Sequence, residues 1–117
     1  MKKTESKIQA ESYKWFTNTY CLKHHEPRCL MFSVPNELAG RNARATVFAK
    51  TLGLTAGVSD TIVMFPNQVI FLEFKTKKGR QSKKQKEFQD RVESLGQEYY
   101  IIRSVEEFKE LITSKLV

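Results

Sequence analysis

The stretch "GVSDTIVMFPNQVIFLEFKTKKG", Gly57–Gly79, predicts two adjacent strands, over 60–65 and 68–75, joined by a short turn. Side chains alternate between the two faces of a strand. In the second strand both faces are largely apolar, which predicts a central strand covered on both sides. One face carries Val69, Phe71, Glu73 and Lys75, and the other carries Ile70, Leu72 and Phe74.

Two acidic residues lie in these otherwise apolar strands. If Phe65 pairs with Gln68, counting back along the ladder places Asp60 opposite Glu73, with Cβ atoms about 5 Å apart. Carboxylates so placed repel each other unless a divalent cation lies between them, and Mg²⁺ or Mn²⁺ prefers oxygen ligands of this kind. A three-residue loop would instead put the two carboxylates on opposite faces of the sheet. Alternatively, each carboxylate is simply solvated at the end of a strand.

Helical and extended patterns alternate along the rest of the chain. Apolar residues at three- and four-residue steps predict helices, and an S-x-x-E capping box opens the last one at Ser104. The order of elements, αβ(α)ββαβα, predicts an α/β (α+β) fold with a mixed central sheet flanked by helices. The expected elements are a helix over 4–20, a strand over 29–34, a short helix over 41–53, strands over 60–65 and 68–75, a helix over 82–96, a strand over 99–103 and a helix from 104.

The composition is that of a small, basic protein. Twenty Lys and Arg against thirteen Asp and Glu give a net charge of +7, which favours a polyanion such as nucleic acid as partner. The length of 117 residues suits one domain over 1–117. No run approaches the roughly 20 apolar residues of a membrane span, and the start lacks the apolar centre of a signal peptide. We expect a cytoplasmic protein with no membrane partner and no organic cofactor.

The stretch "CLKHHEPRC" brackets two histidines with Cys21 and Cys29. Four such ligands in one loop suggest a zinc site, but His24 and His25 are adjacent and the spacing is not that of a zinc finger. A disulfide is disfavoured in a reducing compartment. The simpler interpretation is two reduced thiols, with Cys29 partly buried at the start of a strand.

Three short motifs follow one another in a characteristic order: "GVSD", "EFK" and "SKKQ". Thirteen residues lead from Asp60 to Glu73, and "SKKQ" opens a helix. This arrangement resembles the virus-type replication-repair nuclease (VRR-NUC) family within the PD-(D/E)XK nuclease superfamily. The likeness extends to "ESKIQ", "VPNELAGRN", "LGLTAGVSD" and "SLGQEYYIIRSVEEF". Ser59 departs from the family, which generally has proline before the aspartate; this loosens the turn and removes no ligand.

The resemblance implies a restriction-endonuclease-like core and a metal-dependent phosphodiesterase. Asp60 and Glu73 would hold Mg²⁺ or Mn²⁺ with help from the carbonyl of Phe74. Lys75 would act at the attacking water or at the scissile phosphate. A cation polarises the phosphoryl oxygen, and an adjacent ammonium stabilises the charge that builds in the transition state.

Two further residues carried over from the family have an alternative each. Gln85 would support the site, but Ser82 and Gln85 also form an S-x-x-Q capping box, so this glutamine can serve the start of the helix instead or as well. In the first helix the resemblance favours Glu5, which belongs to "ESKIQ", as the acid near the metal. Glu11 is the alternative.

Basic residues surround the predicted catalytic strand. They suggest a rim that grips phosphates beside the cut site, or simply a solvated turn. The candidates that follow the strand are Lys77, Lys78, Arg80, Lys83 and Lys84, and Arg41, Asn42 and Arg44 extend them.

The motifs together predict a nuclease that hydrolyses DNA phosphodiester bonds, on structured or branched DNA of the kind met in replication and repair, such as a Holliday junction. One alternative is a basic nucleic-acid-binding module on the same fold with little or no activity. Another is a metal-stabilised structural domain. We also expect a homodimer, because one small domain offers one metal site and little surface for DNA. Leftover apolar residues would form its interface, with Trp15, Tyr20, Phe48 and 99–101 the first candidates.

Overall fold

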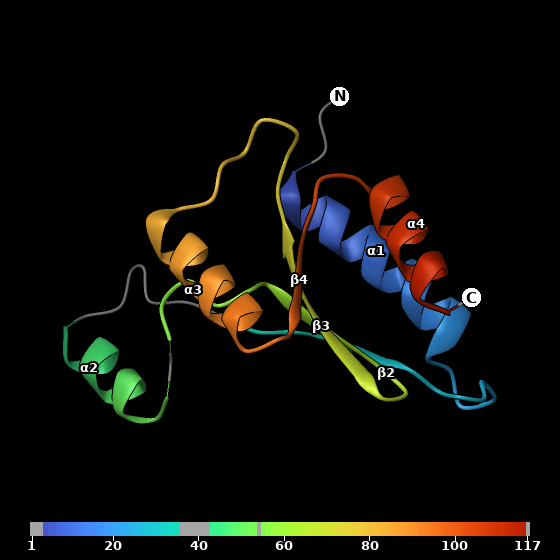
Figure 1. Ribbon diagram of the computed structural model, residues 1–117, viewed down its shortest axis with the longest axis horizontal. Helices are drawn as coiled ribbons and strands as arrows, with labels where there is room; N and C mark the ends of the chain where they lie inside the picture. The colour runs from blue at the N-terminus through green and yellow to red at the C-terminus, as the bar shows by residue number, and fades with distance from the viewer. Residues whose placement is uncertain (1–3, 36–42, 54, 117) are drawn as a thin grey trace.

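The computed structural model describes residues 4–35, 43–53 and 55–116, and each predicted element is present in it (Figure 1). The elements agree with the predicted bounds to within two residues, as is usual for helix and strand ends, and residues 41–42 of the predicted short helix lie outside the described part of the chain. They are α1 Glu5–Tyr20, β1 Leu30–Ser33, α2 Ala43–Thr51, β2 Thr61–Phe65, β3 Gln68–Phe74, α3 Lys83–Ser94, β4 Glu98–Ile102 and α4 Val105–Leu116.

The four strands form one mixed sheet in the order β1-β2-β3-β4. The first two pairings are antiparallel, and β4 runs parallel to β3 after the crossover through α3. Phe65 pairs with Gln68, which confirms the register on which the opposition of Asp60 and Glu73 depends. Pro66-Asn67 closes the turn with Asn67 at φ 65°, the positive value that the third residue of a type II turn needs.

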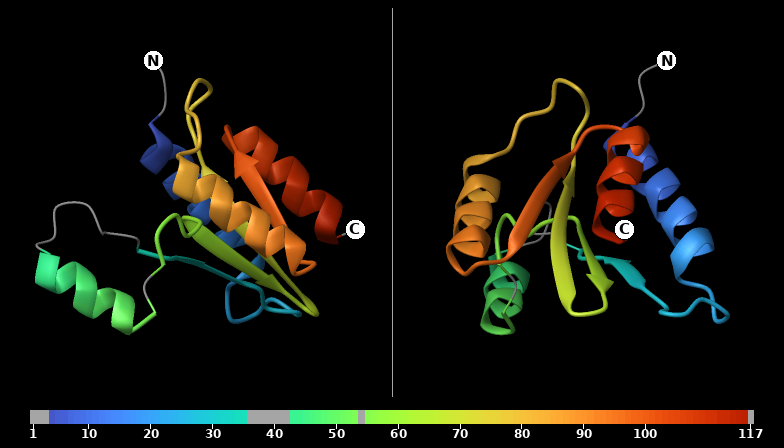
Figure 2. Two further views of the ribbon diagram at one scale, coloured as in Figure 1. Left: turned by 60° about the vertical axis from the view of Figure 1, so that its left-hand side comes forward. Right: turned by 45° about the vertical axis from the view of Figure 1, so that its right-hand side comes forward.

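The central strand β3 is covered on both sides, as predicted. Helices α1 and α4 pack side by side on one face of the sheet and α3 covers the other (Figure 2). Phe16 and Phe108 meet edge to face beneath the first face, and Phe74 packs against Phe108. On the opposite face Phe88 of α3 packs against Phe71. The alternation of β3 therefore divides its side chains between two apolar layers.

The core takes up part of the apolar residues that were candidates for a dimer interface. Tyr99 is only 5% exposed, and Trp15 and Tyr20 pack against the buried cluster around Phe16. Tyr99 is therefore not available to an interface, whereas Trp15 and Tyr20 are only partly buried, and the homodimer stays a prediction. Phe48 on α2 is 65% exposed and remains available.

Side-chain caps fix the starts of three helices. Thr4 accepts a hydrogen bond from Lys7 N, and Ser82 and Gln85 form the full reciprocal capping box predicted for α3. At α4, Ser104 accepts from Glu107 N, but the Glu107 carboxylate accepts from Arg103 N rather than from Ser104 N. The predicted box at Ser104 is thus half formed.

Leu95 and helix α2 lie outside the packed core. The helical periodicity predicts Leu95 on the apolar stripe of α3 with Phe88 and Val92, but the helix ends at Ser94 and Leu95 is 74% exposed. Helix α2 stands apart from the sheet in every view (Figures 1 and 2).

Within the described residues, no helix is long and apolar enough to cross a membrane.

Candidate active site

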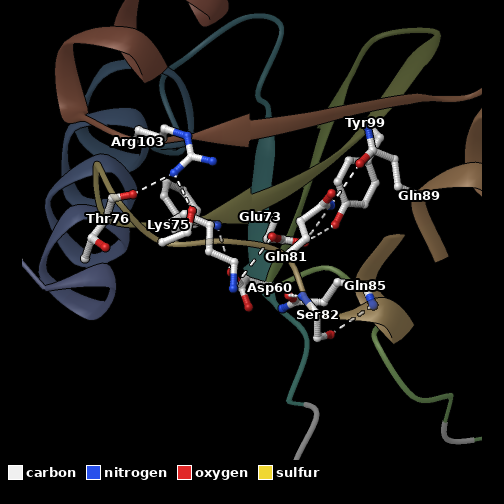
Figure 3. A network of polar contacts seen from close by, with 12 residues as sticks. Asp60, Glu73, Lys75, Thr76, Gln81, Ser82, Gln85, Gln89, Tyr99 and Arg103 are labelled. Atoms are coloured by element: carbon white, nitrogen blue, oxygen red, sulfur yellow. Dashed lines mark hydrogen bonds and ion pairs between the residues drawn. The ribbon is translucent and has the colours of Figure 1, made fainter. Parts of the chain in front are cut away.

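Asp60 lies at the entrance to β2 and faces the end of β3 (Figure 3). Its Oδ2 accepts a hydrogen bond from the backbone N–H of Phe74 at 2.8 Å, and its own carbonyl accepts from Val34 N at 2.8 Å. The backbone thus continues the pairing with β1 by one residue. Together with the register of β2 and β3, these bonds place Asp60 beside Glu73.

Glu73 is fully buried, and its two carboxylate oxygens have different surroundings (Figure 3). Oε1 accepts a hydrogen bond from the Tyr99 hydroxyl and a longer one, 3.4 Å, from Gln81 Nε2. Gln81 is itself held by Gln89, whose Oε1 accepts from Gln81 Nε2 at 2.8 Å. Oε2 has no hydrogen-bond partner among the described residues. A buried carboxylate oxygen left in this way is costly unless a cation compensates it.

Lys75 brings a positive charge to this carboxylate. Its Nζ lies 3.9 Å from Glu73 Oε2, and its side chain is 12% exposed. The backbone N–H of Lys75 donates to Ile102 O at 2.9 Å, so the pairing with β4 holds this residue in line with β3. At 3.9 Å the ammonium is an ion-pair partner but too distant to serve as a hydrogen-bond donor to Oε2.

The electrostatic environment of Asp60 favours its protonated form. Burial is the main cause that raises the pKa of this carboxyl, and the negative charges of Glu73 and Glu5 raise it further. The hydrogen bond from Phe74 N and the charge of Lys75 act in the opposite direction. Two neighbouring carboxylates that disfavour each other's charge are the arrangement expected where a cation is to be held.

The two candidate acids of the first helix are both exposed on α1. Glu5 is one of the negative charges that raise the pKa of Asp60, which favours it over Glu11 as the acid near the carboxylate pair. No group of three or more His, Cys, Asp or Glu side chains within residues 4–35, 43–53 and 55–116 is arranged to hold a metal. Asp60 and Glu73 are therefore the pair from which a site would be built.

The residues present fit a hard divalent cation. Oxygen donors from two carboxylates are the ligands that Mg²⁺ and Mn²⁺ take. The buried Glu73 Oε2 without a hydrogen-bond partner is an acceptor still to be satisfied. Burial is the main cause of the raised pKa of Asp60, and the negative charges of Glu73 and Glu5 add to it at the same place.

Gln85 stands at the start of α3, where its side chain serves the helix. Its Oε1 accepts from Ser82 N at 2.8 Å, and its backbone N–H donates to the Ser82 hydroxyl. The amide that reaches Glu73 belongs instead to Gln81. Nothing in the sequence singles out Gln81 or Gln89, because a glutamine before a helix and one on its polar side are ordinary surface residues. Tyr99 is, by its sequence context, only an apolar strand residue.

Gly57 brings the loop before Asp60 against the first turn of α3. It has φ +78°, and a Cβ there would lie 2.2 Å from Lys84 O and 2.8 Å from Gln85 N. No other residue fits this approach without a backbone shift. The glycine thus links the "GVSD" segment to the "SKKQ" helix start.

The predicted basic residues fall into three places. Lys77, Lys78 and Arg80 are exposed on the turn after β3, and Lys83 and Lys84 are exposed on the first turn of α3. Arg44 is exposed on α2, while Arg41 and Asn42 lie outside the described residues. Arg103, which the sequence does not single out, donates from Nη1 to the carbonyls of Thr76 and Gly79, both at 2.7 Å (Figure 3). Arg103 thus holds the backbone of the basic turn that carries Lys77 and Lys78.

The loop with two cysteines and two histidines is organised by its own turn. Cys21 and Cys29 are free thiols, and burial raises the pKa of both. His25 Nδ1 accepts a hydrogen bond from Leu22 N at 2.8 Å, which engages one of the candidate zinc ligands. The two cysteines are not joined in a disulfide, and the interpretation as two reduced thiols stays a prediction.

The fold matches that of a solved protein described as a "VRR_NUC domain protein". The TM-score is 0.74 at 17% sequence identity, and the match covers 97% of this chain and 88% of that chain. At this identity the likeness concerns the fold, and it confirms the VRR-NUC-like, restriction-endonuclease-like architecture that the motifs indicated. No family model and no curated protein matches the sequence.

Proposed function

We propose that this protein is a metal-dependent nuclease that hydrolyses DNA phosphodiester bonds. The observation that carries the proposal is the meeting of Asp60, Glu73 and Lys75 at the ends of two paired strands, with one buried oxygen of Glu73 lacking a hydrogen-bond donor among the described residues. Two carboxylates and an ammonium are groups suited to metal-assisted hydrolysis of a phosphodiester. The fold, which matches a VRR_NUC domain protein, supports the same chemistry by analogy.

Asp60 and Glu73 would hold Mg²⁺ or Mn²⁺, with the Phe74 carbonyl as a further oxygen donor and Glu5 as the acid approaching from α1. When bound, such a cation supplies a Lewis acid for the phosphoryl group and lowers the pKa of water. Gln85 keeps α3 in register with the site through its cap, and thereby supports the loop that Gly57 packs against it.

Lys75 would place its positive charge at the phosphate. Its side chain is 12% exposed, and Glu73 already lies beside its Nζ, so the ammonium is fixed near the two carboxylates at little further entropic cost. Charge that develops on the phosphate oxygens during hydrolysis is stabilised by a cation fixed in advance. The Asp60 carboxylate accepts from Phe74 N, which fixes its orientation in the same way.

The substrate we propose is structured or branched DNA, gripped at its phosphates by Lys77, Lys78, Arg80, Lys83, Lys84 and Arg44, with Arg41 beyond the described residues. A homodimer would present two sites to such a substrate. Sedimentation at micromolar concentration tests the dimer, and a monomer that cleaves branched DNA at full rate contradicts it.

The decisive experiment compares linear, nicked, flap and four-way-junction DNA with and without Mg²⁺ or Mn²⁺. We expect cleavage that requires metal and that Asp60→Ala or Glu73→Ala abolishes. Asp60→Ala should keep its metal-free thermal stability or gain some, because it removes one of two facing carboxylates. Glu73→Ala also leaves the buried Tyr99 hydroxyl without its acceptor, so it should fold but melt lower. Normal turnover in both variants contradicts the assignment. Salt-sensitive DNA binding without any cleavage would instead establish the alternative, a basic binding module.

A further inference from the structure

A groove runs between α1 and the outer edge of the sheet. One part is a hollow of about 570 Å³ between helix residues 6–13 and strand residues Met31 to Ser33, with Thr61 at its base. A second hollow of about 170 Å³ continues it toward Arg28. The two share Tyr13 and Met31, so they form one path along the helix.

One end of the groove is formed by residues that adjoin the candidate site residues in the chain. Ser6, at one end, follows Glu5, whose charge acts on Asp60, and Thr61 follows Asp60 directly. Strand β1 is the edge of the sheet, and no further strand of the described residues lies beyond it. A chain lying in it would lead from the candidate cleavage centre past Tyr13 to Arg28.

The lining suits nucleotides. Tyr13 is 46% exposed, which leaves a large part of its side chain open to stack on a base. Hydroxyl and amide groups of Ser6, Gln9 and Ser33 line the same hollow. Thr61 is 1% exposed, and its hydroxyl has no hydrogen-bond partner among the described residues. A bound ligand could supply the hydrogen bond that this buried hydroxyl lacks.

The charge of the groove is also complementary to a polyanion. Among the described residues that line the two hollows, none carries a carboxylate, and the one formally charged side chain is that of Arg28. Its Nε donates to Cys21 O at 2.7 Å, which anchors the guanidinium at the far end. An extended peptide could pair with the β1 edge, but it would not explain an exposed aromatic ring on a groove without carboxylates.

We propose that this groove binds a single-stranded nucleic-acid segment that leads to or from the cleavage centre, with a base stacked on Tyr13. The inference rests on the proposed function. A single strand bound in the groove implies that the nuclease acts on a duplex with an unpaired arm. Binding by the groove itself needs neither metal nor cleavage.

The test measures binding in EDTA by fluorescence anisotropy, with an oligothymidylate of about twelve nucleotides and a blunt hairpin duplex. Tyr13→Leu keeps an apolar side chain but removes the aromatic face, and it should weaken single-strand binding about five- to a hundredfold. Tyr13→Phe keeps the ring and should bind as the wild type does. Duplex affinity should change less than about twofold in both variants, since it depends on phosphate contacts elsewhere.

Thr61→Val adds a readout that a structural role would not produce. It removes a buried hydroxyl that lacks a partner among the described residues, so the folded protein should be equally stable or more stable. Single-strand affinity should nevertheless fall about two- to tenfold if a base supplies the missing partner. Unchanged single-strand binding in Tyr13→Leu, equal losses on single strand and duplex, or no single-strand binding by the wild type overturns the proposal. Selective loss in Tyr13→Leu without cleavage of any DNA leaves the groove established and the nuclease proposal refuted.

Discussion

Tyr99 on β4 donates its hydroxyl hydrogen to Oε1 of Glu73 on β3, and thereby leaves Oε2 of the same carboxylate on the side of Lys75. The neighbouring strands run parallel, with Glu73 paired to Ile101, so the tyrosine reaches the carboxylate from two residues back along β4. Burial, and next the hydrogen bond to Glu73, raise the pKa of Tyr99. Its hydroxyl therefore stays protonated, and remains a donor, at neutral pH.

The first prediction follows from this contact. Tyr99→Phe keeps the ring in the core but frees Glu73 to rotate, so the metal concentration needed for half-maximal cleavage should rise about ten- to a hundredfold. Titration of activity with Mn²⁺ measures this, and calorimetric titration of the metal checks it without DNA.

Tyr100→Phe is the matched control for that variant. The Tyr100 hydroxyl donates to Glu98, on the same strand but away from the candidate site. Its loss should leave the metal dependence unchanged. Equal metal affinity in Tyr99→Phe and the wild type would show that Glu73 is held in place without the Tyr99 hydroxyl.

The second prediction concerns the close approach at Gly57. An alanine there would combine a positive φ with a Cβ only 2.2 Å from the backbone carbonyl of Lys84. Backbone strain and the forced shift should together lower the free energy of unfolding by at least about 2 kcal/mol. Thermal melting measures the loss.

Gly96→Ala separates the two causes. Gly96 has φ +79°, close to that of Gly57, but nothing lies within 4 Å of the position of its Cβ. This variant should show the strain without the clash, with a cost of about 1 kcal/mol. If Gly57→Ala and Gly96→Ala have the same melting temperature, the loop before Asp60 does not depend on its contact with α3.

The parts of the site that follow from strand periodicity could be predicted from the sequence. The alternation of apolar residues in β3 placed Asp60 beside Glu73 on the assumption that Phe65 pairs with Gln68, and the structure has that pairing. The S-x-x-Q pattern also predicted the capping box of α3, because a cap depends on neighbours within one turn.

Contacts between elements distant in the chain could not be predicted in this way. Tyr99 reaches a carboxylate 26 residues earlier, and Arg103 reaches the carbonyl of a residue 27 positions earlier. Neither contact leaves a periodic trace in the sequence. Burial is equally hard to predict where it depends on the exact end of a helix, as at Leu95.

The third prediction uses an ion-pair network away from the site. The Glu98 carboxylate accepts hydrogen bonds from Lys115, Tyr100 and Gln68, and the bond from Lys115 is the main cause that lowers its pKa. A carboxyl whose pKa is lowered on folding stabilises the folded state above its unfolded pKa, and that stabilisation is lost as pH falls through the folded pKa.

Glu98→Gln should therefore melt lower than the wild type at neutral pH. The difference should disappear as pH falls below the ordinary glutamate value of about 4.3 and through the lower folded pKa. The Glu98 side chain is 39% exposed, so screening limits the effect to about 1 kcal/mol or less. Glu110→Gln, an exposed change on α4, corrects for the loss of one negative charge. A difference between Glu98→Gln and the wild type that stays constant with pH would contradict the network.

The last prediction concerns how Arg103 presents the basic turn. Its guanidinium holds the carbonyls of Thr76 and Gly79, which flank Lys77 and Lys78. Arg103→Lys keeps the charge, but both bonds come from Nη1, whose N–H groups are fixed in the guanidinium plane, and a lysine ammonium has no such fixed orientation. The turn then has to be ordered when DNA binds, and affinity should fall about three- to tenfold, the equivalent of one or two missing hydrogen bonds.

Salt dependence distinguishes this effect from the removal of a charge that faces a phosphate. In Arg103→Lys the slope of log affinity against log salt should stay that of the wild type because no charge is removed. Replacing Lys77, Lys78 and Arg80 by glutamine should reduce that slope by about 0.9 for every phosphate of duplex DNA that the variant no longer neutralises. A wild-type DNA affinity in Arg103→Lys would show that the turn is ordered without the hydrogen bonds from Arg103. A flattened slope in that variant would show instead that Arg103 itself binds a phosphate through its guanidinium.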